Sequence, residues 1–212
     1  MNKMQKKIMV VEREKLFCSD SFQGFAPADG VDYYSRIREH YRYHVRGEAE
    51  NRPDLKQPIA YCLIAHRASR KIFAYQRSSK QGDYSEKRLM GKWSWGIGGH
   101  IDQIDAGGKD PIQSSMLREV QEEIHIAGFE QPQVVGYIND DENTVGQVHF
   151  GVLFLLWTDD EQVRPNDREM SWGGFKSLAE LEEICADPQL SVETWSSISL
   201  EPLRTLIESS KR

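Results

Sequence analysis

The pattern of apolar and polar residues predicts one central helix. Apolar residues recur every four positions, as on the buried side of an α-helix, at Ile112, Met116, Val120 and Ile124. Asp110 and Pro111 come directly before this stripe. Aspartate is a favoured N-cap residue, and proline is favoured at the first helical position. The pattern therefore predicts a helix that begins at Pro111 and turns one apolar side towards the core.

Shorter apolar runs predict β-strands on both sides of this helix, at residues 7–11, 59–66, 71–77, 133–138 and 145–157. Residues 22–27 are typical of a turn-rich connection, and residues 31–46 carry a helical apolar stripe. Near the C-terminus, Ser177 and Glu180 have the spacing of a capping box, which predicts a helix over residues 177–185. A last helix is predicted around Leu203 and Ile207.

Two parts of the chain are expected. Residues 1–56 are interpreted as an N-terminal extension, a strand plus a helix, that packs on a main domain of residues 57–212. The polar sides of the predicted helix 31–46 carry several arginines and histidines. Such a surface suits phosphate or nucleic acid, although charged helix faces are mostly solvated.

Composition narrows the classes of protein. The chain has 212 residues and a net charge of −6, which argues against a protein that coats nucleic acid. Its three cysteines are widely spaced and favour neither a disulfide framework nor a zinc cluster. The longest apolar run, residues 152–157, is far too short to span a bilayer. These features predict a cytoplasmic protein without a membrane partner.

Three carboxylates mark the central helix. Glu119, Glu122 and Glu123 stand three and four positions apart and therefore share one helix face. Oxygen ligands of this kind suit Mg²⁺ or Mn²⁺, whereas an isolated glutamate-rich face is more often simply solvated. Gly98 and Gly99 precede the helix, and glycine allows the positive φ or close approach that a phosphate or metal site needs.

These segments together resemble a known motif. Residues 98–102 and 118–123 are similar to the Nudix box, Gly-x5-Glu-x7-Arg-Glu-U-x-Glu-Glu-x-Gly-U, where U is a bulky aliphatic residue. Gly99 fits the first glycine, and Asp105 stands at the following glutamate, but the spacer to Arg118 is then too long. Alternatively, Asp110 takes that role at the proper distance. His125 replaces the second glycine of the motif.

The resemblance implies an α/β fold, a Nudix-like α/β/α sandwich with a mixed β-sheet. It also implies hydrolysis of a diphosphate linkage in a nucleoside diphosphate derivative or related phosphoester, with Mg²⁺ or Mn²⁺ as cofactor. The metal ligands would be Glu119, Glu122, Glu123 and the Gly99 carbonyl. Arg118 would hold a glutamate by an ion pair, and the backbone at Gly98 and Gly99 would lie beside the phosphates.

Further residues are candidates for the same site. In the family picture, Arg77 closes a strand where a basic residue often contacts substrate, although it is equally compatible with a solvated strand end. His100 follows the double glycine, and His149 lies in a predicted strand, where it either contacts substrate or is structural. Glu169, in a late loop, is a candidate general base, with Glu122 or Glu123 as alternatives. The loop at residues 78–88 is either a substrate-specific insertion or simple surface.

Two other classes stay open. The fold also supports isomerases of isoprenoid diphosphates, which need a catalytic cysteine or acid, and Cys62 lies on a predicted strand. A buried structural thiol is the alternative for that residue. The other class is a non-catalytic nucleotide-binding sensor. The resemblance also suggests a homodimer with a small-molecule diphosphate as its ligand.

Overall fold

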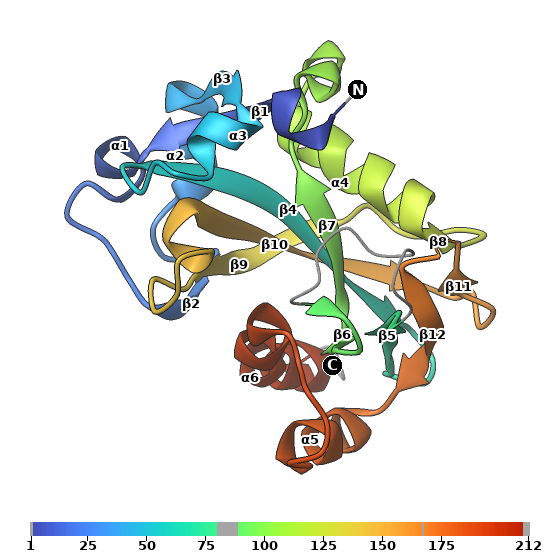
Figure 1. Ribbon diagram of the computed structural model, residues 1–212. Helices are drawn as coiled ribbons and strands as arrows, with labels where there is room; N and C mark the ends of the chain where they lie inside the picture. Colours follow the sequence, from blue (N-terminus) through green and yellow to red (C-terminus); the bar gives the residue numbers. More distant parts are fainter. Residues whose placement is uncertain (1, 80–88, 167, 210–212) are drawn as a thin grey trace. The chain divides into compact units, whose positions relative to one another are not determined.

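The computed structural model describes residues 2–79, 89–166 and 168–209. It has a mixed α/β fold with a large mixed β-sheet, which confirms the predicted fold class (Figure 1). The chain divides into two compact units. Unit 1 comprises residues 1–61, 98–119 and 134–154, and unit 2 comprises residues 62–97, 120–133 and 155–212. The predicted boundary at residue 56 stays a prediction.

Unit 1 contains short elements from the first quarter of the chain: η1 (Lys3–Gln5), β1 (Lys7–Glu12), α1 (Arg13–Phe17), β2 (Gly24–Pro27), α2 (Tyr33–His40), β3 (Arg42–Val45) and α3 (Arg46–Ala49). Two 3-10 turns follow later, η3 (Gln103–Gly107) and η4 (Gly146–Val148). Strand β1 pairs antiparallel with β3 and with the start of β4 (Leu55–His66). Strand β2 pairs antiparallel with β9 (Gln133–Asn139).

Two of the predicted segments in unit 1 are wrong. The helix expected over residues 31–46 ends at His40, and residues 42–45 form β3. Tyr41, Tyr43 and Val45 alternate and favour a strand, and β1 offers them an edge to pair with. The turn-rich connection at residues 22–27 contains strand β2, because the edge of β9 is available to it.

The basic side chains of α2, β3 and α3 are engaged within the protein. Arg36 pairs with Asp20 at 2.6 Å, and Arg42 pairs with Glu12 at 2.5 Å. Arg46 lies 3.1 Å from Glu50, one helical turn later. These intramolecular pairs favour the solvated-surface interpretation of this segment over a phosphate-binding one.

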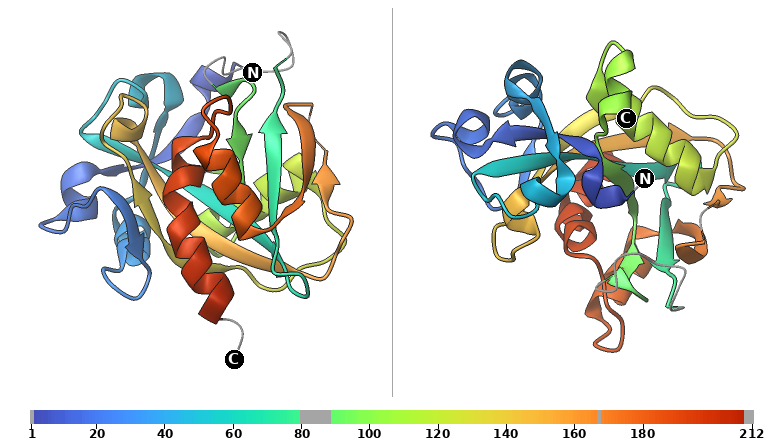
Figure 2. Two further views of the ribbon diagram at one scale, coloured as in Figure 1. Left: turned by 90° about the horizontal axis from the view of Figure 1, so that it is seen from below. Right: turned by 45° about the horizontal axis from the view of Figure 1, so that its top comes forward.

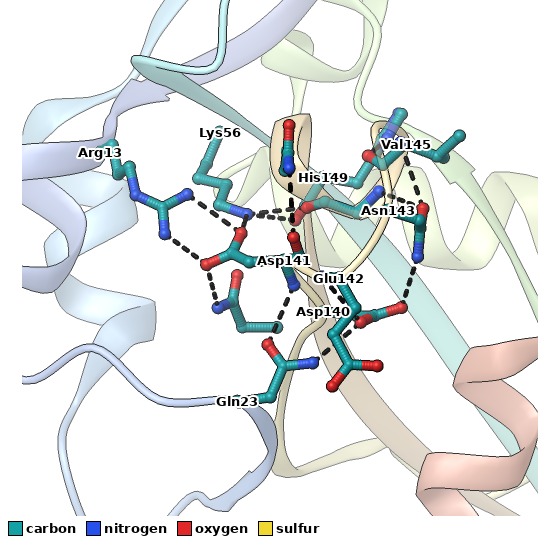
Figure 3. A network of polar contacts seen from close by, with 12 residues as sticks. Arg13, Gln23, Lys56, Asp140, Asp141, Glu142, Asn143, Val145 and His149 are labelled. Atoms are coloured by element: carbon teal, nitrogen blue, oxygen red, sulfur yellow. Dashed lines mark hydrogen bonds and ion pairs between the residues drawn. The ribbon is translucent and has the colours of Figure 1, made fainter.

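A buried charge network holds the loop after β9 in unit 1 (Figure 3). The ammonium of Lys56 is fully buried and donates to Asp141 at 2.8 Å and to the carbonyls of Gly146 and His149 at 2.7 and 3.1 Å. Arg13 donates to the same Asp141 carboxylate. Burial lowers the pKa of Lys56 to about 8, although Asp141 partly offsets this effect. The loop that leads into β10 (His149–Thr158) is therefore fixed by ionic hydrogen bonds.

Unit 2 contains β5 (Ile72–Arg77), β6 (Trp93–Ser94), β8 (Ile124–His125), β11 (Arg164–Pro165), β12 (Met170–Lys176), α5 (Leu178–Ala186) and α6 (Thr194–Ser209). Strand β5 pairs antiparallel with β12, β6 and the end of β4. Helices α5 and α6 lie side by side (Figure 2). The predicted capping box of α5 is confirmed, because Ser177 and Glu180 each accept from the backbone N–H of the other.

The remaining elements, β7 (Gly96–His100) and α4 (Pro111–Glu123), run from one unit into the other, as do β4, β9 and β10. The apolar stripe of the central helix is confirmed: Ile112, Met116, Val120 and Ile124 are all buried.

In the part of the chain that the structure describes, no helix is both long and apolar enough to cross a membrane. Most of the loop predicted at residues 78–88 lies outside the described residues.

We expect Asp141→Asn to lower the free energy of unfolding by about 2–4 kcal/mol at pH 7, because it leaves the buried Lys56 ammonium without its ionic partner. Desolvation opposes the charged form of Asp141, but hydrogen bonds from Arg13 and Lys56 outweigh it and lower the pKa of this carboxyl. Its stabilisation is therefore complete above the unfolded pKa near 4 and is lost as the pH falls further.

Urea denaturation between pH 3 and 7 measures this effect, with the exposed Asp29→Asn as the control in the same unit. The control should match the wild-type protein throughout. Equal stabilities of Asp141→Asn and wild type at pH 7 would show that the network contributes nothing to the fold.

Candidate active site

Helix α4 begins as predicted and fixes the position of its carboxylates. The Asp110 carboxylate accepts from the backbone N–H groups of Ile112 and Gln113, at 3.0 and 3.3 Å, and so caps the helix. Asp110 also accepts from the Tyr34 hydroxyl at 2.9 Å. The first turn of α4 is thereby anchored within unit 1.

The double glycine allows two close approaches within unit 1. A Cβ atom added to Gly98 would lie 2.0 Å from the carbonyl oxygen of Ala60. A Cβ atom added to Gly99 would lie 2.4 Å from a carboxylate oxygen of Glu119. Neither glycine has a positive φ. Glycine is therefore needed at these two positions for the close approach of neighbouring atoms and not for a positive φ.

Arg118 connects the loop before α4 with the first glutamate of the helix. Its guanidinium donates twice to Asp105, at 2.9 and 3.0 Å, and once to Glu119 at 2.7 Å. It also donates to the carbonyl of His100 at 3.2 Å. Burial would lower the pKa of Arg118, but its hydrogen bonds and charge pairing with Asp105 and Glu119 outweigh burial and raise it. Arg118 thus holds a glutamate by an ion pair, as the motif implied.

The structure decides between the two acids that could fill the glutamate position of the motif. Asp105, with a side chain only 4% exposed, is the bidentate partner of Arg118, whereas Asp110 caps the helix. Asp105 lies within the 3-10 turn η3, where its carboxylate accepts from the backbone N–H of Asp102 at 2.9 Å, and the long spacer follows it. The insertion therefore lies after Asp105 and leaves its contact with Arg118 intact.

The end of the helix explains the missing second glycine. After Glu123 the chain enters β8 directly, and His125 pairs in extended conformation with Arg164. Because His125 does not adopt a positive φ, no glycine is required there. Asn166 binds this end of the helix, with its backbone and side-chain N–H groups donating to the carbonyls of Glu123 and Glu122 at 2.8 and 3.2 Å.

Comparison with known proteins supports the same assignment. No family model matches the sequence. The chain is 34% identical over 212 residues to protein YmaB of Bacillus subtilis (strain 168), covering 96% of this chain and all of YmaB. Its structure matches the crystal structure of Tm1382, described as a Nudix hydrolase candidate, with a TM-score of 0.73 and 25% identity over 95% of this chain and all of Tm1382.

The chain belongs to the Nudix family. The Nudix domain of Shewanella oneidensis NrtR, solved with ADP ribose, has the same fold, with a TM-score of 0.51 and 15% identity over 71% of this chain and 88% of that domain. The predicted Nudix-like α/β architecture is thus confirmed.

The Nudix carboxylates fit a hard divalent ion. Glu119, Glu122 and Glu123 follow one another on α4 at helical spacing, and Glu119 occupies the space that a side chain at position 99 would fill. Oxygen donors of this kind are the ligands that Mg²⁺ and Mn²⁺ prefer. That these residues are the ligands stays a prediction.

Other predicted site residues have structural contacts in unit 2. Arg77 pairs with Glu193 at 2.7 Å, and both side chains are nearly buried. Glu169 is half-buried directly before β12, and its carbonyl accepts from the backbone N–H of Ser78 at 2.7 Å. Whether either residue contacts substrate stays a prediction. Sequence reasoning missed Glu193, because nothing near it in sequence indicates that it meets Arg77.

Cys62 is fully buried on β4, and burial raises the pKa of its thiol. A thiol of this kind is inert at neutral pH.

Trp95 is likewise buried, and its indole N–H donates to Ser199 at 3.0 Å, so it belongs to the core of unit 2.

His100 and His149 lie close together in unit 1, with their Nε2 atoms 3.1 Å apart. Both histidines are candidate substrate-binding residues, and that role stays a prediction. Sequence reasoning missed two of their neighbours. Gln57 accepts from His100 Nε2 at 2.9 Å, and Glu50 lies beside both rings. The residues come from four separate segments, so no local motif connects them.

We expect Asp105→Asn to lower the free energy of unfolding by about 2–4 kcal/mol, because the half-buried guanidinium of Arg118 loses its buried bidentate partner. Asp110→Asn is the matched control and should cost less than about 0.5 kcal/mol, since asparagine caps a helix as well as aspartate. Chemical denaturation of the two variants measures the difference. The reverse order of stabilities would assign the motif's acid to Asp110.

Proposed function

We propose that this Nudix protein hydrolyses a diphosphate linkage in a nucleoside diphosphate derivative, with Mg²⁺ or Mn²⁺ as cofactor. The observation that carries the proposal is the fixed position of Glu119. Its carboxylate lies against the backbone of Gly99 and receives a hydrogen bond from Arg118 at 2.7 Å. A carboxylate held by ion pairing beside bare backbone is preorganised to receive a cation.

The residues of α4 have distinct roles in this proposal. Glu119, Glu122 and Glu123, with the Gly99 carbonyl, are the metal ligands, and Arg118 orients Glu119. A bound divalent ion would neutralise the diphosphate and lower the pKa of an attacking water. Because Arg118 stays protonated, it keeps Glu119 ionised and available as a ligand.

Substrate binding and proton transfer involve further groups. The backbone at Gly98 and Gly99 has no side chain to keep phosphate oxygens away, and Arg77, which pairs with Glu193, is the proposed basic contact to substrate. Glu169 is proposed as the general base that accepts the proton of the attacking water, with Glu122 or Glu123 as the alternative.

The proposed substrate class comes from proteins of the same fold. The NrtR Nudix domain was solved with ADP ribose, and another protein of this fold, from Francisella tularensis, is an NMN adenylyltransferase/ADP ribose pyrophosphatase. We therefore propose ADP ribose and related nucleoside diphosphates as the first compounds to test. The suggested homodimer is a separate proposal, which the mass of the purified protein in solution would decide.

We expect the purified chain to release nucleotide or phosphate from at least one nucleoside diphosphate compound when Mg²⁺ or Mn²⁺ is present. Glu122→Gln should lower kcat/KM by on the order of 10²-fold or more, because it removes a charged metal ligand. The exposed Glu161→Gln is the control and should keep full activity. Cys62→Ala should keep it as well, since the buried thiol takes no part.

The alternatives give different results. Loss of activity in Cys62→Ala with unchanged folding would favour isomerase chemistry. Absence of turnover on every compound, together with tight binding of one of them, would favour a nucleotide sensor and contradict the proposed hydrolysis.

A further inference from the structure

Three side chains of unit 1, none of them on α4, bring metal-binding atoms together. One oxygen of Glu50 and one ring nitrogen each of His100 and His149 lie within 4.8 Å of one another. Glu50 follows α3, His100 ends β7, and His149 begins β10. His149 is buried, and the other two are half-buried. The cluster is therefore assembled by the fold of unit 1 rather than by one flexible segment.

The two imidazoles have the spacing of ligands to one ion. Their Nε2 atoms are 3.1 Å apart, and their rings are nearly perpendicular, at 73°. Two nitrogens that each lie about 2.0–2.1 Å from the same ion are themselves roughly 3 Å apart in tetrahedral or octahedral geometry. The observed spacing needs no rearrangement of either ring.

The supporting contacts fix His149 in the tautomer that a ligand needs. Its Nδ1–H donates to the carbonyl of Val145 at 2.7 Å, so the lone pair of the neutral ring lies on Nε2, towards His100. Ligating histidines commonly donate their second N–H to a carbonyl in this way. The backbone of His149 is held as well, because its carbonyl accepts from Lys56 at 3.1 Å.

The surroundings of the other two donors agree. Glu50 pairs with Arg46 at 3.1 Å, which fixes its carboxylate. Gln57 is fully buried, and its carbonyl oxygen accepts from His100 Nε2 at 2.9 Å. To bind an ion, His100 Nε2 must lose this proton, and a water on the ion would then donate to the Gln57 carbonyl in its place. The amide nitrogen of Gln57 is buried and has no hydrogen-bond partner among the described residues. A water bound to an ion at this position would offer that amide an acceptor.

An ordinary hydrogen bond between the two histidines is the simpler alternative. It accounts for the 3.1 Å distance, with His100 Nε2–H shared between Gln57 and His149. It does not account for the closeness of the Glu50 carboxylate, which pairs with Arg46, to both rings, or for the unsatisfied amide of Gln57. One ion would account for all three features.

We propose that Glu50, His100 and His149 bind a divalent first-row transition metal, with Zn²⁺ as the best-fitting ion. Two imidazole nitrogens and one carboxylate oxygen are a typical donor set for zinc with an open position for water or another ligand. Mg²⁺ prefers oxygen ligands alone and is not expected to bind here. This site uses none of the proposed Mg²⁺ or Mn²⁺ ligands of α4 and does not depend on the proposed hydrolysis.

The test uses the full chain, stripped with a chelator and dialysed, and titrated with Zn²⁺ in a calorimeter. We expect one zinc ion per chain, and His100→Gln and His149→Gln should each weaken binding by on the order of 10²-fold or more. Glu50→Gln should weaken it less. The controls His125→Gln and Glu48→Gln, which alter a histidine and a glutamate outside the cluster, should keep wild-type affinity.

Two further measurements keep the test decisive if a variant folds poorly. Zn²⁺ should raise the Tm of the wild-type protein and of Glu122→Gln but not of the cluster variants, since a ligand stabilises only the form that binds it. Co²⁺ bound to the wild-type protein should give the visible absorption of nitrogen ligation, which needs no variant. Unchanged zinc affinity in both histidine variants, or loss of zinc binding in Glu122→Gln, would overturn the proposal.

Discussion

The ion pairs of Arg118 are the contact on which the candidate active site depends. One guanidinium binds Asp105 in the loop before α4 and Glu119 on the helix itself, and it also donates to the carbonyl of His100. A planar group with five donors can satisfy several acceptors in fixed directions, which lysine cannot do. Loop, strand end and carboxylate are thereby held together within unit 1. The close contact of Glu119 with Gly99 follows from this arrangement.

The sequence predicts well what local patterns determine. The cap at Asp110, the buried stripe of α4 and the capping box of α5 all depend on spacings within one or two helical turns. Resemblance to the Nudix box adds the ion pair between Arg118 and a glutamate, which the contact with Glu119 confirms. In each of these features, the interacting residues lie close together in the sequence.

The predictions that were wrong and the contacts that were missed involve residues far apart in the sequence. The sequence predicts helix where β3 forms, because the pairing partner β1 lies far away along the chain. The buried Lys56 reaches Asp141, and Arg77 reaches Glu193, and no pattern in the sequence indicates either pair. Glu50 and Gln57 join the two histidines from separate segments for the same reason. Contacts made only by tertiary folding therefore cannot be predicted from periodicity and motif spacing.

The turn η3 has a consequence for how related chains are detected. It holds the acid in place before the insertion begins, so the residues added between Asp105 and Arg118 leave their ion pair intact. The ion pair requires only that the two charged groups meet in space, and it forms here across a long spacer. A signature written with fixed gaps would pass over such proteins. A search for an acid and an arginine brought together ahead of a glutamate-bearing helix would retain them.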